Sequence, residues 1–341
     1  MNIFAKLNVH LIKSFEMKKA IKFSFLLSAF ALLALVNQSF GQTMEEATNA
    51  YNKGVELSAT DLPKAIESLL NAADIASKIG PEAEEIKKTA ESQISLLQYN
   101  YATSLYKDKK IDEAIAGFIL AHDYAVKYND APTQAKADDL LPKLYLAKGS
   151  AELKENKLPE AIAAFDKALS YDAGFAKAHL SKGLVYKKQD KFDEMKASMD
   201  KAIETGTSSA DDKTVASAKK TMASEYIRKA NAAFKKGTFA QVISSVDESV
   251  KYEDNNVEAF YLYALSYNKL SKWDEAISNA EKGLSLEENT PEKQARFHYE
   301  IGVAQAGKKN NDAACAAFKK SAVGPLAEQA NYQIKTVLKC K

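Results

Sequence analysis

The sequence predicts an all-α fold, a solenoid of about seven helix-turn-helix repeats that ends in a capping helix. The 341 residues include only 7 prolines and 13 glycines, whereas Ala, Lys, Glu and Leu are abundant, and this composition favours helix. We find no alternating run of β-branched residues of the kind that indicates a strand. Small residues recur along the chain, and the steps from Gly149 to Gly183 and from Ala230 to Ala264 are both 34 residues. A fixed period of this size indicates a stack of small supersecondary units.

Residues 1–41 have the layout of a secretory signal peptide, with Met17 as the better start. A short basic segment at 17–22 precedes the mostly apolar residues 23–36, and small residues stand at 39 and 41. An apolar stretch of this length spans about 21 Å as a helix, short of the roughly 30 Å hydrocarbon core, so a transmembrane anchor is the weaker alternative. We therefore expect cleavage after Gly41. The exported chain would then be secreted into the periplasm, or lie at the outer-membrane periphery, of a Gram-negative bacterium.

The charge of the chain is concentrated in that N-terminal segment. Residues 1–41 carry five lysines against one acid, so the formal +2 of the whole chain becomes −2 for residues 42–341. A nearly neutral chain has no electrostatic reason to bind nucleic acid or an anionic membrane. We expect no nucleic-acid partner and no transmembrane anchor in the mature chain.

Two further columns come into register when the repeats are aligned on their small residues. Bulky residues form one column and small residues the other, three positions further on. The columns are Leu69, Phe118, Phe165, Met199, Val246 and Phe318, and Ala72, Ala121, Ala168, Ala202, Ser249, Gly283 and Ser321. A spacing of three places both columns on one face of a second helix. Short polar turns, such as residues 155–157, separate the two helices, so each unit is predicted to be an antiparallel helix pair.

These columns resemble the tetratricopeptide repeat (TPR), in which small, aromatic and bulky residues occupy fixed positions of a helix pair. The resemblance covers roughly residues 44–324 and is best at 148–169 and 260–286. It implies a TPR solenoid, and it says much about the fold but little about the function.

The spacing between repeats exceeds 34 residues at several places. Proline and acidic residues mark helix starts there, for example at Pro81, Pro132 and Pro291, which predicts lengthened first helices. Residues 205–212 are the most polar break and the expected internal boundary. This gives an N-terminal array of about four repeats at 42–205 and a C-terminal array of about three at 206–324.

Residues 325–341 are expected to form the capping helix that covers the last repeat. An apolar stripe on that helix would comprise Leu326, Ala330, Ile334, Val337 and Leu338.

The resemblance also implies that the first helices line a groove that binds a partner. Carried over position by position, the groove residues are Tyr99, Tyr106, Leu146, Leu153, Leu180, Leu184, Ile227, Asn231, Phe234, Tyr261, Leu265, Asn268, Arg296 and Tyr299. An apolar, tyrosine-rich groove suits an extended peptide or a helix. The alternative is that some of these residues only pack between long first helices. The Lys/Asn carboxylate clamp of chaperone-binding TPRs is missing from its expected positions.

Lysine recurs at one repeat position, in Lys107, Lys154, Lys188, Lys235 and Lys269. Such a row indicates either an anion-binding track or solvated helix ends. Because lysine is common at this position in TPRs, the second interpretation is favoured.

The two cysteines, Cys315 and Cys340, leave two interpretations open. Cys315 falls in a column of isoleucines and is compatible with a small core residue. An even count in an oxidising compartment favours instead a disulfide that fastens the cap to the last repeat.

The sequence offers no chemistry that would indicate an enzyme. It contains no HExxH, CxxC or P-loop motif and no Gly-rich dinucleotide fingerprint. We expect no catalytic, cofactor or metal site. The predicted function is a non-catalytic scaffold or adaptor in the bacterial cell envelope that binds a protein partner, through a peptide or helix, in the groove. The alternative is a capture protein for a glycan or peptide, associated with an outer-membrane system, and self-association is also possible.

Overall fold

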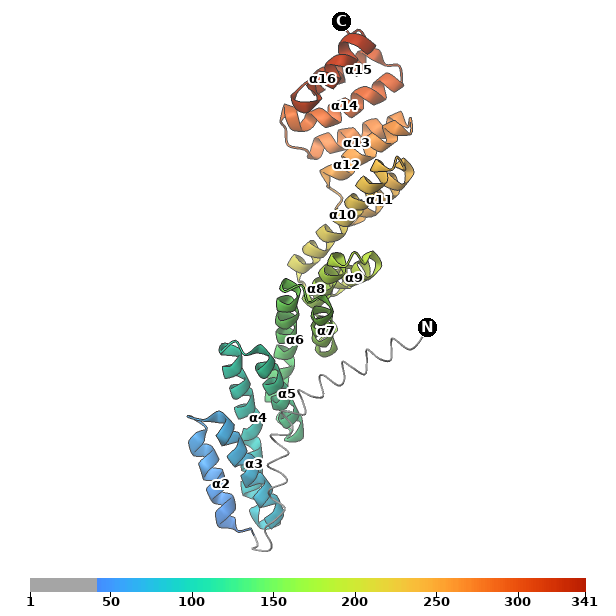
Figure 1. Cartoon of the computed structure of the whole chain (residues 1–341). Coiled ribbons are helices and arrows are strands. Elements are labelled where there is room, and N and C mark those ends of the chain that lie inside the picture. Colours follow the sequence, from blue (N-terminus) through green and yellow to red (C-terminus); the bar gives the residue numbers. More distant parts are fainter. Residues whose placement is uncertain (1–41) are drawn as a thin grey trace. The chain divides into compact units, whose positions relative to one another are not determined.

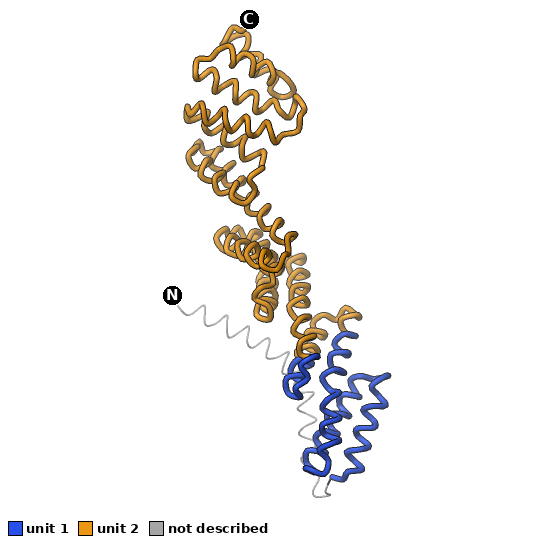
Figure 2. Tube along the Cα trace, turned by 180° about the vertical axis from the view of Figure 1, so that it is seen from behind, with its two compact units in different colours: residues 1–104, 120–133 blue, residues 105–119, 134–341 orange. Residues whose placement is uncertain are grey.

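The computed structural model describes residues 42–341, and these residues form fifteen α-helices joined by short turns and short 3₁₀ or π segments (Figure 1). The all-α prediction is therefore confirmed for this part of the chain. The predicted signal peptide, residues 1–41, lies outside the described residues. The described residues divide into two compact units, residues 42–104 with 120–133 and residues 105–119 with 134–341 (Figure 2).

The first unit contains helices α2 (Met44–Leu57) and α3 (Leu62–Ile79), a 3₁₀ turn η2 (Pro81–Ala83), most of α4 (Glu84–Lys107) and the end of α5 (Ile111–Lys127). Helix α2 begins with a capping box, in which the Thr43 hydroxyl and the Glu46 carboxylate each accept a backbone N–H bond from the other residue. The core of the first unit is built around Leu69 and Ile94, both fully buried, with tyrosines packed at the edge of this core.

The second unit contains the remaining helices, in successive pairs. Their bounds are α6 (Ala131–Lys154), which begins in the first unit, α7 (Leu158–Tyr171), α8 (Ala176–Lys188), α9 (Phe192–Ser208), α10 (Asp212–Lys235), α11 (Phe239–Tyr252), α12 (Val257–Lys269), α13 (Trp273–Leu286), α14 (Pro291–Gly307) and α15 (Asn311–Ser321). A capping segment follows, made of η3 (Gly324–Leu326), α16 (Ala327–Tyr332) and the π-helix η4 (Gln333–Val337).

Glycine in the first helix of a pair packs directly against a bulky side chain of the second. A methyl group on Gly149 would lie 2.6 Å from the ring of Phe165, and one on Gly183 would lie 2.8 Å from Met199. Phe165 and Met199 are themselves fully buried. The small and bulky columns of the sequence are therefore the two sides of one interface, which lets the helix axes approach closely.

The turns inside the pairs repeat one conformation. Asn156, Asp190 and Ser271 have φ of 61°, 54° and 58°, the left-handed region that ends many helices. The next residue closes the turn, as when the Lys191 N–H donates to the Tyr186 carbonyl at 3.0 Å. Short polar residues tolerate this region better than apolar ones do, which explains the polar turns of the sequence.

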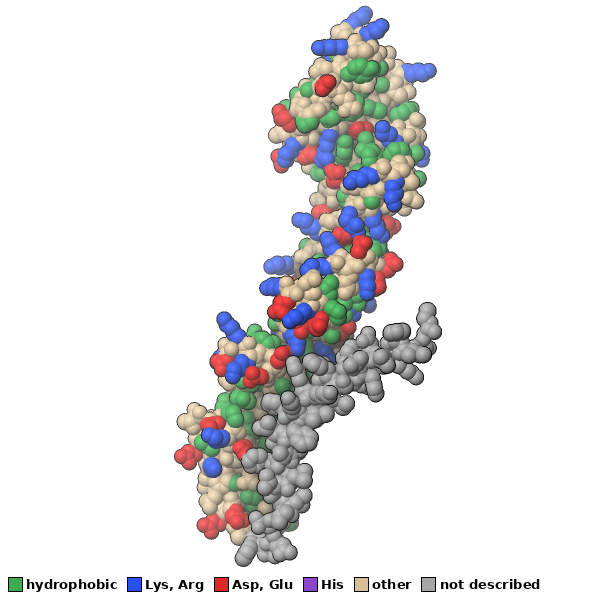
Figure 3. Space-filling model, in the orientation of Figure 1, with side chains coloured by type: hydrophobic (Ala, Val, Ile, Leu, Met, Phe, Trp, Pro, Cys, Tyr) green, Lys and Arg blue, Asp and Glu red, His purple; other side chains and the backbone are tan. Residues whose placement is uncertain are grey.

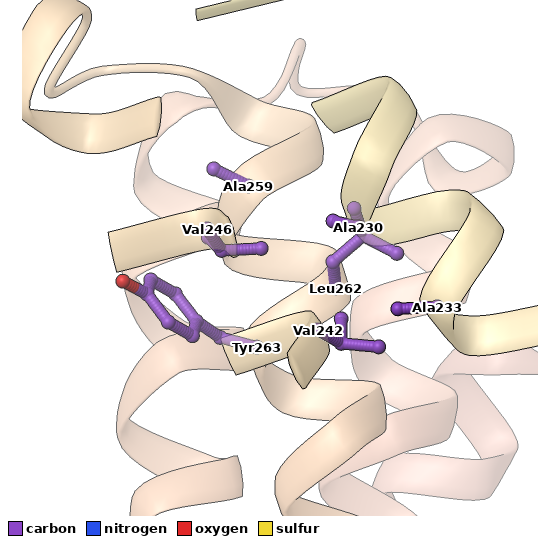
Figure 4. Packing of buried hydrophobic residues seen from close by; sticks show 7 residues of the cluster. All are labelled: Ala230, Ala233, Val242, Val246, Ala259, Leu262 and Tyr263. Carbon is purple, nitrogen blue, oxygen red and sulfur yellow. The ribbon is translucent and has the colours of Figure 1, made fainter. Parts of the chain in front are cut away.

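Each pair also packs against the first helix of the next pair. Figure 4 shows Ala230 and Ala233 of α10, Val242 and Val246 of α11, and Ala259, Leu262 and Tyr263 of α12 converging in one cluster. Three consecutive helices thus share one core, as a repeat array requires.

The lengthened first helices predicted from the irregular spacing are present. Helices α4, α6 and α10 each have 24 residues, whereas α8 and α12 have 13. The expected break at 205–212 lies inside the second unit. Helix α9 continues to Ser208, and the turn is confined to residues 209–211. Gly206, near the end of α9, is buried where a side chain would collide with Val215.

The C-terminal cap differs from the single helix that we expected for 325–341. Only six residues form α16, and the Leu338 N–H donates to the Gln333 carbonyl at 2.9 Å in a wider π turn. The wider turn breaks the 3.6-residue register on which the apolar stripe was placed. Ala330 is fully buried as expected, but Val337 is 52 % exposed.

Gly149 tests the close approach of paired helices. We expect Gly149→Ala to lower the free energy of unfolding by about 1–2 kcal/mol, because overpacking against Phe165 outweighs the gain in helix propensity. Urea unfolding followed by circular dichroism measures the change. Gly174→Ala, in an exposed turn, is the control and should have little effect. Adding Phe165→Leu should restore part of the loss, and a Gly149→Ala protein as stable as the parent would contradict the packing argument.

Candidate functional site

A pocket of about 320 Å³ lies near the C-terminal end of the second unit, where α12, α14 and the capping segment meet. It is lined by Tyr261, Leu265, Asn268, Lys269, Arg296, Tyr299, Glu300, Val303, Leu326 and Gln329. The α12 and α14 residues repeat at three- and four-residue intervals, so each helix presents one face to the pocket. Leu326 and Gln329 of the capping segment complete the wall.

Arg296 is held firmly at one side of the pocket. Its two terminal nitrogens donate to Glu258 at 2.7 Å and to Glu287 at 2.9 Å. Its guanidinium carbon lies 4.9 Å from the centre of the Tyr261 ring. Because both terminal nitrogens already bind a carboxylate, the charge of Arg296 is compensated within the fold.

Glu300 and Asn268 form a buried polar pair in the pocket wall. They are 5 % and 6 % exposed, and Asn268 Nδ2 donates to the Glu300 carboxylate at 2.7 Å and to the Glu300 carbonyl at 2.9 Å. Burial raises the pKa of Glu300, against the opposing effects of the Asn268 hydrogen bond and the Lys269 charge. Asn268 Oδ1 is buried and has no hydrogen-bond partner.

Two tyrosines supply rigid aromatic surfaces. The Tyr261 ring lies edge-on to Phe297 with centroids 5.8 Å apart, and the Tyr299 ring lies edge-on to Phe318 at 5.2 Å. Burial raises the pKa of Tyr261 to about 12 and also raises the pKa of Tyr299, so both phenols stay neutral at physiological pH.

A disulfide fastens the capping segment. Cys315 of α15 and Cys340 are bonded, with Cα atoms 5.8 Å apart and a sequence separation of 25. Leu326 and Gln329 lie inside the loop that this bond closes. Lys319 Nζ adds a second tie by donating to the Lys341 carbonyl at 2.9 Å.

The pocket brings together five of the fourteen predicted groove residues, namely Tyr261, Leu265, Asn268, Arg296 and Tyr299. The other nine lie elsewhere on first helices. These are Tyr99 and Tyr106 on α4, Leu146 and Leu153 on α6, Leu180 and Leu184 on α8, and Ile227, Asn231 and Phe234 on α10.

Several of those nine residues also belong to the packing between repeats. Ile227 and Phe234 pack against the cluster of Figure 4, and Leu180 packs against the core around Met199. Tyr106 and Leu184 are more open, at 43 % and 36 % exposed. Their role in binding a partner stays a prediction.

Sequence reasoning missed Glu300, Val303, Leu326 and Gln329 as pocket residues. A glutamate on a helix is normally solvated, and only the packing of α12 against α14 buries this one. The cap residues were assigned to packing alone, because nothing in the repeat pattern shows that the cap borders a pocket.

Neither a metal site nor a membrane-spanning helix is found among the described residues. Residues 42–341 contain no group of three or more His, Cys, Asp or Glu side chains placed to hold a metal ion. None of the helices in this range is long and apolar enough to cross a membrane. Basic and acidic side chains are intermixed on the face shown in Figure 3, with apolar patches between them.

Three family models match parts of the chain. A TPR repeat model matches residues 149–190, a tetratricopeptide repeat model matches 176–205, and the model described as anaphase-promoting complex, cyclosome, subunit 3 matches 210–283. No curated protein matches the chain in sequence.

Several solved structures are similar to the chain. YrrB, described as a TPR protein with an unusual peptide-binding site, is 21 % identical over 57 % of this chain and 88 % of its own, with a TM-score of 0.32. A tetratricopeptide repeat protein from Parabacteroides merdae is 16 % identical over 87 % of this chain and 100 % of its own, with a TM-score of 0.30. The TPR2AB domain of yeast Sti1, solved in complex with pHSP90, is 15 % identical over 87 % and 98 %, with a TM-score of 0.33. TM-scores this low establish no shared function.

Glu300→Gln tests how much ionisation of the buried Glu300 carboxyl lowers the stability of the fold. A raised pKa means that the folded state prefers the protonated form, so ionisation destabilises the fold as the pH rises above 4.5, the usual value for this group. The variant keeps an oxygen for Asn268 and cannot ionise. We expect it to melt at a higher temperature than the parent at pH 7 and at the same temperature at pH 4. An equal difference at both pH values would show that ionisation is not the cause.

Removing the disulfide should loosen the cap selectively. In the chain-entropy model a loop of this length contributes about 3–4 kcal/mol, which Cys315→Ser with Cys340→Ser would remove. We expect faster amide hydrogen exchange in residues 322–338, including the Leu326 and Gln329 wall, while exchange in α8 and α9 stays unchanged. If exchange in residues 322–338 were no faster in the double variant than in the parent, the disulfide would not hold the cap locally.

Proposed function

We propose that this chain, in which residues 149–205 match tetratricopeptide-repeat models, is a non-catalytic scaffold that binds a peptide or helix of a protein partner along its first helices. Such repeats are binding modules, and function lies in the side chains that each array presents. The observation that carries the proposal is the C-terminal pocket. Residues assigned to groove positions of two successive repeats, α12 and α14, line one cavity there.

The lining of the pocket is suited to a protein ligand. Leu265, Val303 and Leu326 supply apolar surface, the tyrosines supply aromatic surface, and Asn268, Glu300 and Gln329 supply polar groups. A mixture of this kind is typical of sites that anchor a side chain of a partner. The pocket walls are firmly held by ion pairs, edge-to-face ring contacts and a disulfide, so little side-chain ordering would oppose binding.

We place the scaffold in the cell envelope of a Gram-negative bacterium. Support comes from the basic, apolar and small-residue segments in succession at 17–41 and from an even number of cysteines, which suits an oxidising compartment. The partner would then be an envelope protein. N-terminal sequencing of the protein from the envelope fraction tests this location. Protein found in the cytoplasmic fraction with an uncleaved N-terminus that still begins at Met17 would contradict it.

Leu265→Asn tests whether the pocket binds the partner. The half-buried Leu265 lines the pocket, whereas Leu270, 39 % exposed, stands in the turn after α12 and outside it. With the purified protein as bait in envelope extract, we expect Leu265→Asn to weaken capture of its stoichiometric partner by about tenfold or more. Leu270→Asn is the matched control and should capture the partner as the parent does. These positions are preferable to Phe234 and Tyr261, whose rings contribute to the core.

Equal capture by the parent and by Leu265→Asn, with both folded by circular dichroism, would exclude the pocket as the binding site. Loss of capture with both leucine variants would indicate a general effect on the fold.

A further inference from the structure

We propose that the C-terminal pocket takes a basic side chain of the protein partner, the ammonium of a lysine or the guanidinium of an arginine. Glu300 would be its counter-charge, and Tyr261 and Tyr299 its walls. The inference rests on the proposed function, since it names the chemistry that the same pocket selects.

The polar groups buried in the pocket wall need hydrogen-bond donors. Asn268 Oδ1 has no partner, and the Glu300 carboxylate accepts from Asn268 Nδ2 but forms no ion pair within residues 42–341. The orientation of the Asn268 amide is fixed, because the opposite one would turn its oxygen toward the carboxylate and the carbonyl of Glu300. Unsatisfied buried acceptors are costly, and a ligand rich in N–H groups relieves that cost.

The charges around the pocket also favour a cation. The pocket lining itself has two basic residues, Arg296 and Lys269, and one acidic residue, Glu300. Glu258 and Glu287, which bind Arg296 from outside the lining, bring the local count to three carboxylates against two cations. Arg296 already donates to Glu258 and Glu287, and these two carboxylates offset its positive charge. Lys269 is exposed at the end of α12, where water screens its charge and the helix dipole favours it.

The aromatic walls suit the same ligand. Ring faces attract ammonium and guanidinium groups, and Arg296 already uses the Tyr261 ring in this way at 4.9 Å. The aliphatic part of a lysine or arginine would lie against Leu265 and Val303, as such side chains do when they enter a partly apolar pocket. A ligand cation next to Glu300 would also offset the cost of ionising a carboxyl whose pKa burial has raised.

Selection from a phage-displayed random peptide library on the purified protein tests the inference. Peptides enriched by the protein should carry a lysine or arginine at a fixed position, flanked by apolar residues. For one such synthetic peptide, followed by fluorescence anisotropy, we expect replacement of its base by glutamine to weaken binding by about 30-fold or more. Glu300→Gln in the protein should weaken binding of the unchanged peptide by a similar factor. Applied together, the two changes should cost little more than either alone.

Two further variants act as controls. Glu292→Gln makes the same substitution at an exposed site on α14 and should leave affinity unchanged. Lys269→Ala removes the cation at the rim and should raise affinity for the basic peptide by about two- to fivefold. If the pocket instead selected an acidic group, Lys269→Ala would weaken binding. The Glu300→Gln protein is expected to be at least as stable as the parent, so its lost affinity would not reflect unfolding.

Each outcome decides between the proposals. Enriched peptides that lose affinity in Leu265→Asn but carry no base, or that bind Glu300→Gln as tightly as the parent, would overturn the basic-ligand inference and leave the scaffold function standing. Enrichment of acidic peptides would do the same. If no peptide bound the folded protein, that result would count against both the basic-ligand inference and the scaffold function.

Discussion

The close approach of paired helices, made possible by a small residue facing a bulky one, is the constraint on which this structure depends. Gly149 against Phe165 and Gly183 against Met199 show the same geometry in successive repeats. Because each interface lies within one repeat or between neighbours, stability is distributed along the chain and no single core holds it together. Residues on the exposed faces of the first helices, such as Tyr106 and Leu184, can therefore change without disturbing the interface that defines the repeat.

A stack of this kind must also end, and its end creates the candidate site. After the helix pair α14 and α15, the capping segment packs where the first helix of another pair would otherwise pack, and Ala330 is buried there. The cap is short and partly π-helical, and the bond between Cys315 and Cys340 fastens it where its own apolar contacts are few. Since it covers only part of the face of α14, a cavity remains beside it. Leu326 and Gln329 therefore have two roles, in closing the solenoid and in shaping the pocket.

The repeat pattern predicted the helix pairs, the long first helices and the polar turns, because each depends on interactions between residues close in sequence or on one fixed column. It also assigned Tyr261, Leu265 and Tyr299 to groove positions, and the structure places these three residues in the pocket lining. It could not identify Glu300. Burial of that carboxyl depends on how α12 meets α14, a tertiary contact for which the sequence carries no signal. The wider turn at the C-terminus was missed for a similar reason, since a hydrophobic stripe cannot distinguish an α turn from a π turn.

The pair of Glu300 and Asn268 is the point at which stability and function diverge in this chain. A fold optimised for stability alone would place an apolar residue at a site that is 95 % buried, because a carboxyl there loses hydration without gaining a cation. Elsewhere in the same unit a similarly buried glutamate, Glu225, is bound by Lys187 at 2.9 Å and by Arg228 at 2.7 Å. Glu225 is thus satisfied by the fold, whereas Glu300 lines a pocket and lacks a cation. That contrast indicates that the missing partner of Glu300 comes from outside the chain.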